Sequence, residues 1–568
     1  MVRTVVCLLT FFLSSFGYWE FFRKKTNMSV YFLPFFTVTV EFSILFLAGL
    51  LNVMAEAALG LYALGILLLV YHVRTDGLQV IRPYWSWGHL LFAVILGLYI
   101  ITIRGKVLYG EDDFAHWGIA VKKMLETSRM PNFTDEVISF RKYPLGSSLW
   151  IWFFCYFLGD QEDVMLLAQG YMLLCCLFPW FYVVSRNKLM STAVAMIGVS
   201  VVLCYNIGIH SLMVDTLLPL AGMAALFFVF CQRGKDFRDF LPAVPMLIWV
   251  SQIKNSGLLF AVLGSVLLIC SGKRKAGQLA ARTACAAAPL AAFLLWSRHC
   301  DLVFSDASQT KHAVSVENYA VILGLKTDEE IRTILTNVTE YVLKRDGLQL
   351  ALVWILILGA VTLLLLRGYK KEYFLLCAAC GVLSVVYYVG ICGMYLFSMP
   401  TYEAMMLAAI ERYMRTLDIA LMYLMMLYSL RLMSAAGGTR MTGLCCAAVV
   451  CLSFWWLQSP YRLDRIFHFG QYTVERDMFT GLLKGYGVQP GGSYMICADG
   501  YGGLYYFMCC YMLDRVPLCL DVEEVQQMDA AADYDVLINL DTENPIIQDW
   551  IARNYPDHQG EQIIYMFD

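Results

Sequence analysis

The stretch WGHLLFAVILGLYIITIRGKVLYGEDDFAHW, residues 87–117, decides the fold. Its first part, residues 87–104, is almost entirely apolar, and a run of that length can cross a bilayer, which needs roughly 17–25 residues. Three adjacent acids, Glu111, Asp112 and Asp113, follow just past the end of this run. The sequence therefore predicts a transmembrane helix that ends at an acidic patch on the membrane surface.

Composition places the whole chain in a membrane. Of its 568 residues, 59% are hydrophobic and 15% are charged, and the mean hydropathy is +0.61. A soluble domain of this length needs far more charge to cover its surface. The net charge of −3 is too small to indicate a nucleic-acid partner. Apolar runs recur along the chain and predict a polytopic α-helical membrane protein with about 14 spans. The predicted spans lie near 2–22, 29–51, 53–71, 87–104, 162–184, 189–208, 213–231, 240–256, 257–271, 279–297, 348–366, 373–397, 414–433 and 441–457.

One long apolar run, residues 240–271, is interrupted by polar residues. Gln252, Lys254 and Asn255 fall in its middle. A single helix would place these polar groups in the membrane interior, where a charged side chain costs roughly 2.5–3.5 kcal/mol on insertion scales. We therefore expect a tight turn between two short spans at this point.

Basic residues set the expected orientation. Clusters of Lys and Arg fall in every second loop, and such loops face the cytoplasm. The N-terminus and the C-terminus are then both outside, and the first span is not a cleaved signal peptide because its basic flank lies on the wrong side. The large external loops are expected at about 105–161, 298–347 and 398–413. The basic clusters are Arg23, Lys24 and Lys25; Arg74 and Arg82; Arg186 and Lys188; Arg233, Lys235 and Arg238; Lys273, Arg274 and Lys275; Arg367, Lys370 and Lys371; Arg431 and Arg440.

The tail has a different character from the rest of the chain. The segments SYMICAD, VPLCLDV, DYDVLINL and EQIIYMF read as short strands, with helices predicted at Gly503–Leu513 and Pro545–Asn554. This order predicts a small α/β domain with a partly parallel sheet. We divide the chain into a transmembrane domain, 1–457, and an extracytoplasmic domain, 458–568. Four tail cysteines could pair, but their spacing does not say how: Cys497, Cys509, Cys510 and Cys519.

The acidic patch leads into an amphipathic pattern. From Phe114 to Glu126, apolar residues recur at helical spacing, which predicts a helix lying on the membrane surface. Asp112 or Asp113 could cap its N-terminus, where free N–H groups and the helix dipole favour an anion. Capping explains one acid, but it does not explain three that repel one another.

A basic counterpart follows in the same loop. Arg141 and Lys142 precede the Tyr143-Pro144 turn, and residues 145–158 form an apolar segment too short to span a bilayer comfortably. We interpret this segment as a second interfacial or re-entrant helix. The acids and the two bases are then expected to face the same patch, although both bases could instead reach lipid headgroups.

These features, in this order, resemble the first external loop of the GT-C glycosyltransferases. The likeness is to the branch of the protein O-mannosyltransferases and the lipid A aminoarabinose transferases. Three further pieces are similar: Asp215 in HSLMVDTLLPL, Lys254 in WVSQIKNSGLLF, and Arg412 with Tyr413 in ERYMRT. The chain departs from that branch in having extra predicted spans before the acidic loop and a single proline, Pro144, where the branch has a pair.

The resemblance implies sugar transfer from a polyprenyl-phosphate carrier to an extracytoplasmic acceptor. A carboxylate base would deprotonate the acceptor, with Asp113 ranked before Asp112, or these two acids would bind Mg²⁺ or Mn²⁺. Fixed cations would hold the leaving phosphate. The candidates for this phosphate clamp are Arg141, Lys142, Lys254 and Arg412, and the other substrate-binding candidates are Glu111, His116, Tyr143, Asp215 and Tyr413.

Simpler explanations stand beside several of these assignments. Lys254 could form an ion pair with Asp215 and serve only the fold, and Arg412 could pair with Glu411 or Glu403. His116 is isolated and favours a hydrogen-bonded interfacial group over a metal ligand.

Other function classes also remain open for the whole chain. A polytopic transporter or flippase would bury its charges at mid-membrane between related halves. A cell-envelope polysaccharide polymerase or ligase would use a diphosphate carrier. Membrane lipids are expected partners in every case. The sequence carries no eukaryotic targeting tail, which favours a bacterial plasma membrane.

Overall fold

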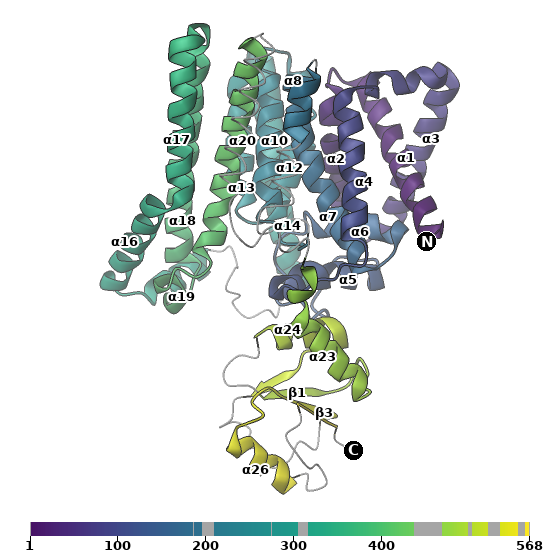
Figure 1. Ribbon diagram of the computed structural model, residues 1–568, viewed down its shortest axis with the longest axis vertical. Coiled ribbons are helices and arrows are strands. Elements are labelled where there is room, and N and C mark those ends of the chain that lie inside the picture. Colours follow the sequence, from purple (N-terminus) through teal and green to yellow (C-terminus); the bar gives the residue numbers. More distant parts are fainter. Residues whose placement is uncertain are drawn as a thin grey trace.

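The chain forms a bundle of helices with a small mixed α/β domain at one end (Figure 1). The computed structural model describes residues 2–185, 187–195, 210–273, 275–304, 316–436, 468–497, 503–520, 534–554 and 563–566. In its first half the helices are α1 (Val2–Lys25), η1 (Val30–Phe32), α2 (Leu33–Leu50), α3 (Met54–Asp76), η2 (Gly77–Tyr84), α4 (Trp87–Ile103), η3 (Asp113–Trp117), α5 (Gly118–Thr127), α6 (Ser148–Leu158), α7 (Glu162–Leu177), η4 (Phe178–Trp180), α8 (Phe181–Val184), α10 (Leu217–Cys231), α11 (Phe237–Phe240), α12 (Ala243–Ile253) and α13 (Gly257–Ser271). The second half of the bundle contributes α14 (Ala276–Val303), α15 (Val316–Gly324), α16 (Asp328–Lys344), α17 (Asp346–Ala360), η5 (Val361–Leu365), η6 (Arg367–Tyr369), α18 (Lys370–Phe397), α19 (Thr401–Met405) and α20 (Ile410–Ala436).

Within the described residues, seven helices are long and apolar enough to cross a membrane by length and composition. This is the architecture of a helical membrane protein, as the composition predicts. Three further predicted spans coincide with shorter apolar helices, α4, α10 and α13. Of the remaining predictions, 441–457 and most of 189–208 lie outside the described residues, so the total of 14 stays a prediction. The seven long helices are Val30–Leu50, Met54–Tyr84, Glu162–Val184, Ala276–Val303, Asp346–Leu365, Arg367–Phe397 and Ile410–Ala435.

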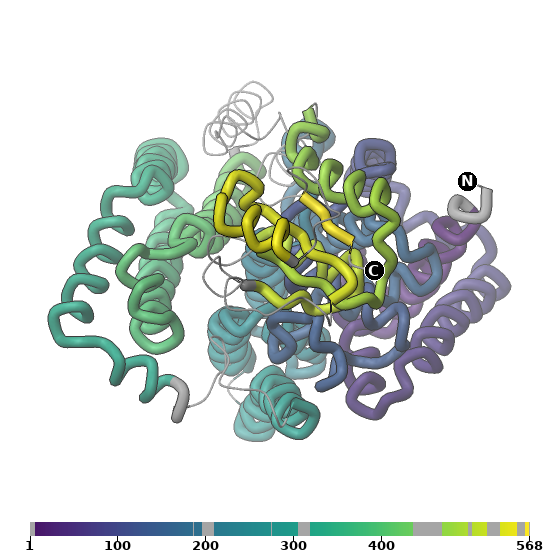
Figure 2. The backbone as a smooth tube through the Cα atoms, turned by 90° about the horizontal axis from the view of Figure 1, so that it is seen from below, coloured from purple at the N-terminus to yellow at the C-terminus, as the bar shows by residue number. Residues whose placement is uncertain are grey.

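The two chain ends lie at the same end of the bundle. The first turns of α1 and the C-terminal domain both sit at the lower end in Figure 1, as do the short helices α16 and α19. Seen from that end, the domain covers the middle of the bundle, and the helices from α15 to α19 form a group at one side (Figure 2). The loops predicted to be external therefore share one end of the molecule.

Small residues let α1 and α3 approach closely. A Cβ atom on Gly17 would meet the backbone of Gly65 and Leu69, and one on Gly65 would meet Ser14. Such close backbone contacts are typical of helix pairs in membranes, where association depends on packing because lipid and side chains are equally apolar.

The half-length helix α6 is surrounded by protein. Nearly all of its side chains are buried, including Trp150 and Trp152, and it ends at Gly159 with a positive φ of 125°. It packs against α5, α7 and α2. Protein therefore encloses α6 on these sides, and the choice between an interfacial and a re-entrant helix stays a prediction.

The predicted interruption between α12 and α13 is present, and it touches the start of α6. Lys254 lies between the two helices with extended backbone. The Gly146 N–H donates to the Gln252 carbonyl at 2.6 Å, and the Trp249 indole N–H donates to the Gly146 carbonyl at 2.8 Å. The turn before α6 is thereby fixed against the break between two short helices.

The C-terminal domain has the strands and helices that its sequence predicts. The described strands form one sheet in the order β2-β1-β3-β4, in which β1 is parallel to β2 and β3, and β4 is antiparallel to β3. Of the tail cysteines, Cys509 and Cys510 are free thiols. The elements are η7 (Phe469–Gln471), α23 (Val474–Gly485), β1 (Tyr494–Cys497), α24 (Gly503–Leu513), β2 (Leu518–Leu520), β3 (Val536–Asn539), α26 (Pro545–Asn554) and β4 (Ile564–Met566).

Candidate active site at the end of the bundle

The acidic motif starts a helix, as predicted, but the first turn is wide. Gly110 accepts hydrogen bonds from the backbone N–H groups of Asp113 and Phe114, at 3.0 and 3.3 Å. The turn η3 is a π-helix that continues directly into α5. An inserted residue of this kind is frequent at functional sites because it redirects side chains within a helix.

The polar face of this helix contacts the C-terminal domain. Tyr511 of α24 covers it: the Lys122 ammonium donates to the Tyr511 carbonyl at 2.6 Å, and the ring centroids of Phe114 and Tyr511 are 5.1 Å apart. That the helix lies on the membrane surface stays a prediction. Its amphipathic pattern arises because the apolar face packs on α6 and the polar face meets the C-terminal domain.

The three adjacent acids point to three different environments. Glu111 is exposed, Asp112 is half-buried and forms an ion pair with Arg412, and Asp113 is fully buried. Asp113 accepts hydrogen bonds from the Ser211 hydroxyl at 3.0 Å and the Leu212 N–H at 2.8 Å. Neither aspartate side chain caps the helix, since Asp112 holds the capping position without a side-chain cap bond.

Burial dominates the acid–base behaviour of Asp113. Loss of solvent raises the pKa of its carboxyl to about 7, although the Leu212 N–H and the Ser211 hydroxyl favour the charged form. Its second oxygen, Oδ2, is buried and has no hydrogen-bond partner among the described residues. Burial also raises the pKa of Glu111, with Asp112 adding to the effect and Arg412 opposing it.

Arg412 brings the late loop to the acidic motif. It lies in the first turn of α20 and pairs with Asp112, while its neighbour Glu411 pairs with Arg415. The alternative of a pair between Arg412 and Glu411 is therefore wrong in this structure. The guanidinium also lies 5.4 Å from the ring centroid of Tyr413.

A second charge pair lies beside the first. The Lys254 ammonium is 3.2 Å from Asp215 Oδ1, and their side chains are 14% and 5% exposed. Lys254 also lies 5.1 Å from the ring centroid of Tyr413, and Asp215 interacts electrostatically with Arg412. The ion pair expected for Lys254 is therefore present, and it forms part of the cluster that contains Arg412.

Tyr143 joins the cluster from the turn before α6. Its ring stacks on Trp117 at a centroid distance of 6.0 Å and lies 5.2 Å from the His116 ring. Burial raises the pKa of its hydroxyl to about 12, while Lys254 opposes that shift. We call Asp112, Tyr143, Asp215, Lys254, Arg412 and Tyr413 the charge cluster.

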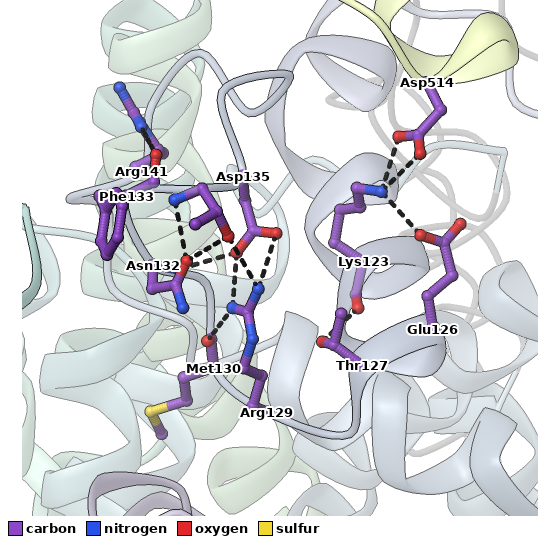
Figure 3. Close-up of polar contacts among 11 residues, drawn as sticks. Lys123, Glu126, Thr127, Arg129, Met130, Asn132, Phe133, Asp135, Arg141 and Asp514 are labelled. Carbon is purple, nitrogen blue, oxygen red and sulfur yellow. Dashed lines mark hydrogen bonds and ion pairs between the residues drawn. The ribbon is translucent and has the colours of Figure 1, made fainter. Parts of the chain in front are cut away.

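The Arg141 side chain points away from the acids. The Arg141 guanidinium donates to the Phe133 carbonyl at 2.9 Å, as Figure 3 shows, and lies 5.7 Å from the Phe304 ring centroid. The Lys142 carbonyl accepts a bond from the Trp296 indole at 3.1 Å. In the described chain neither base contacts the three acids. The predicted face-to-face arrangement is absent because Tyr143 takes the inward position on this turn.

The two aspartates expected to share a divalent cation do not converge. Asp112 is engaged with Arg412 and Asp113 with Ser211, so they do not offer two carboxylates to one ion. The described residues contain no group of three or more His, Cys, Asp or Glu side chains arranged as metal ligands. We therefore derive no step through a metal.

A pocket of about 810 Å³ lies elsewhere, between the first large loop and the C-terminal domain. None of the charge cluster lines it. Of its charged lining residues, Lys123 and Asp514 pair with each other, and Asp135 pairs with Arg129 outside the pocket (Figure 3). We take the charge cluster as the candidate site because its cations and acids converge from distant segments at one point.

Several contributors carry no signal in the sequence. Ser211 and the Leu212 N–H hold Asp113, and the Thr416 hydroxyl lies 3.5 Å from the Asp215 carbonyl. For Thr416 the one available signal is its position one helical turn after Arg412, which places both residues on the same face of the helix.

Comparisons of the chain with protein-family models, with curated proteins and with solved structures found no match.

Proposed function

We propose that this chain is an integral membrane glycosyltransferase that moves a sugar from a polyprenyl-phosphate carrier to an extracytoplasmic acceptor. The observation that carries the proposal is the ion pair between Asp112 and Arg412 beside the pair between Asp215 and Lys254. Two cations, each held by an acid, form a ready binding place for one phosphate, and an acid stands next to it. We also propose that the fold is GT-C-like and that the site faces outwards from a bacterial plasma membrane.

The phosphate end of the donor would bind Arg412 and Lys254. A planar guanidinium can hold two phosphate oxygens, and an ammonium adds a point charge. Both cations lie in a half-buried setting, where charge–charge interactions are stronger than in water. As Arg412 turns to the phosphate, it releases Asp112.

Asp112 is then the general base. The acceptor oxygen attacks the anomeric carbon, its proton passes to the Asp112 carboxylate, and the bond between the anomeric carbon and the phosphate oxygen breaks. The electron pair stays on the phosphate, where Arg412 and Lys254 stabilise it. We assign the base to Asp112 instead of Asp113 because Asp113 has no exposed surface for an acceptor to contact.

Asp113 has a supporting role in this proposal. Its hydrogen bonds to Ser211 and Leu212 tie the acidic turn to the segment that carries Asp215. The two carboxylates of the cluster are thereby held at a fixed separation. Tyr143 and Tyr413 form aromatic walls around the cations.

The deciding experiment is transfer by the purified protein in lipid nanodiscs. Radiolabelled sugars on polyprenyl monophosphate and on polyprenyl diphosphate are offered with membrane extract as the acceptor source. We expect transfer from the monophosphate that is lost in Arg412→Gln and retained in Arg553→Gln, a change at an exposed pair in the C-terminal domain. Transfer from the diphosphate alone would favour the polymerase or ligase alternative.

One observation favours the transporter alternative. Glu41 of α2 is buried within the bundle, 3% exposed, and accepts a hydrogen bond from the Trp150 indole at 2.9 Å. Ionisable groups inside a membrane often mark a translocation path. Transport of a lipid-linked sugar that depends on Glu41 and not on Asp112 would replace the glycosyltransferase proposal.

A further inference from the structure

We propose that Arg476 of the C-terminal domain is a positioning residue for the acidic motif. Arg476 lies in the first turn of α23. It touches none of the charge cluster, yet it fixes the backbone from which Asp112 projects. For its effect on catalysis, this inference rests on the proposed function.

Arg476 joins three elements through a single guanidinium. Nη1 donates to the Leu108 carbonyl and to Glu162 Oε2, both at 2.7 Å, and Nη2 donates to Glu162 Oε1 at 2.9 Å. Arg476 and Glu162 are 14% and 15% exposed. Two parallel bonds to one carboxylate give an orientation that an ammonium cannot reproduce.

Both backbone polar groups of Leu108 are held by charged side chains. Its N–H donates to Glu162 Oε2 at 2.7 Å, and its carbonyl accepts from Arg476. Two residues later, Gly110 accepts the bonds that start η3. The position of this short turn therefore sets where Asp112 meets Arg412.

The ring of Phe114 also packs beside the contact of Arg476 with Leu108 and Glu162. Its centroid lies 5.8 Å from the Arg476 guanidinium and 5.1 Å from the centroid of the Tyr511 ring. If Arg476 were lost, Glu162 would keep a largely buried charge without its cation, and the Leu108 carbonyl would lose its charged donor. A buried carboxylate without a cation and a buried carbonyl without a donor both cost free energy. The turn would therefore shift until these two groups find new hydrogen-bond partners.

The chain also offers a second joint that serves as a control. Lys123 pairs with Asp514 at 2.6 Å and links α5 to the loop after α24 (Figure 3). This pair lies ten positions further along the helix from Asp113 and does not touch Leu108. A change there tests whether any weakened docking of the domain has the same effect.

The test uses the full chain in nanodiscs and follows amide hydrogen exchange together with transfer. In Arg476→Gln we expect exchange across residues 105–118 to speed up about tenfold or more, because charge-assisted bonds of this kind are lost. The turnover rate should fall by a similar factor while the KM for the donor stays unchanged, since Arg412 and Lys254 remain. Arg476→Lys should recover part of both effects, and Glu162→Gln with Arg476→Gln should be no worse than either alone.

Three results would overturn the inference. Exchange across 105–118 could be unchanged in Arg476→Gln, Lys123→Gln could speed it equally, or turnover could persist although the turn has loosened. If the unaltered protein transfers no sugar at all, the proposed function fails. The exchange measurements on Arg476→Gln and Lys123→Gln then decide alone whether Arg476 positions the turn.

Discussion

Arg412 donates a hydrogen bond to Asp112 across 300 positions of sequence. The pair joins the first turn of α20 to the acidic turn before η3. In the proposed mechanism Arg412 must release Asp112 to bind the donor phosphate, so this pair joins the proposed base to the proposed phosphate clamp. Because Asp112 pairs with Arg412 and Asp113 does not, mutating each acid separately should have different effects.

Asp112→Asn should lower the turnover rate by roughly 10²–10⁴-fold, because the amide keeps the size of the side chain and loses its basicity. The thermal unfolding temperature should change little, since an amide oxygen can still accept from Arg412. The matched control is Glu126→Gln, a change at a carboxylate in the same loop that pairs with Lys123. Full transfer by Asp112→Asn would remove the general base from the proposal.

Asp113→Asn should change the pH dependence of stability. The folded carboxyl has a pKa of about 7, against about 3.9 when unfolded, so the unfolded chain releases a proton that the folded chain retains. The free energy of unfolding of the unaltered protein should therefore fall as pH rises from about 4 to 7, by up to about 4 kcal/mol, and level off above 7. The variant should lack this component. Unfolding temperatures from pH 4 to 8 measure the difference, and parallel curves would contradict the prediction.

Lys254→Gln should raise the KM for the donor more than it lowers turnover, because the proposed function has the Lys254 ammonium bind the carrier phosphate. It should also destabilise the protein, since removing one partner of a buried pair strands the other and costs about 3–5 kcal/mol. Asp215→Asn in the same chain should restore much of the stability and none of the donor affinity. A double-mutant cycle on unfolding temperature and on KM separates these effects. Additive losses of stability would show that the pair is not coupled.

Gly146→Ala should destabilise the bundle. A Cβ atom on Gly146 would fall against the Gln252 backbone, which cannot move aside as a flexible side chain can. We expect a lower unfolding temperature and weaker donor use, because the displaced segment carries Lys254. Gly97→Ala is the control, since a Cβ atom there meets nothing within 4 Å. Equal stability of the two variants would argue against the close contact.

The orientation can be tested by cysteine labelling of intact cells. A membrane-impermeant maleimide should react with Glu340→Cys in α16 and Arg553→Cys in α26, above the labelling of the native cysteines. It should not react with Lys273→Cys until the cells are opened. All three positions are exposed on the protein. Labelling of Lys273→Cys in sealed cells would invert the orientation and with it the side of the membrane on which the site acts.

The sequence predicts the local features of this protein well. Hydropathy locates the long helices because a membrane imposes one length on them. The break at Lys254 can be predicted because a charged side chain inside an apolar span is energetically costly. In the tail, short apolar strands alternate with turn residues, and β1 and β3 lie where this pattern places them.

The direction of individual side chains and the pairing of Asp112 with Arg412 were beyond the sequence. Nothing local distinguishes Asp112, which faces Arg412, from Asp113, which is buried; the wide turn of η3 decides it. Arg141 does not take the expected place opposite the acids, because the turn directs its guanidinium towards the Phe133 carbonyl. Arg476 lies in a segment without any motif, so only the folded chain reveals its contact with Glu162.

The long separation between Asp112 and Arg412 also has a consequence for biosynthesis. At about 5–20 residues per second, a ribosome adds the intervening chain in roughly 15–60 s. Asp215 meets Lys254 only 39 positions later, so that pair can form early. Throughout the longer interval, Asp112 lacks its cation and Phe114 lacks the cover of α24. During synthesis the nascent loop therefore exposes an unpaired charge and an apolar ring for this period. Such a loop is a suitable substrate for a chaperone on its side of the membrane.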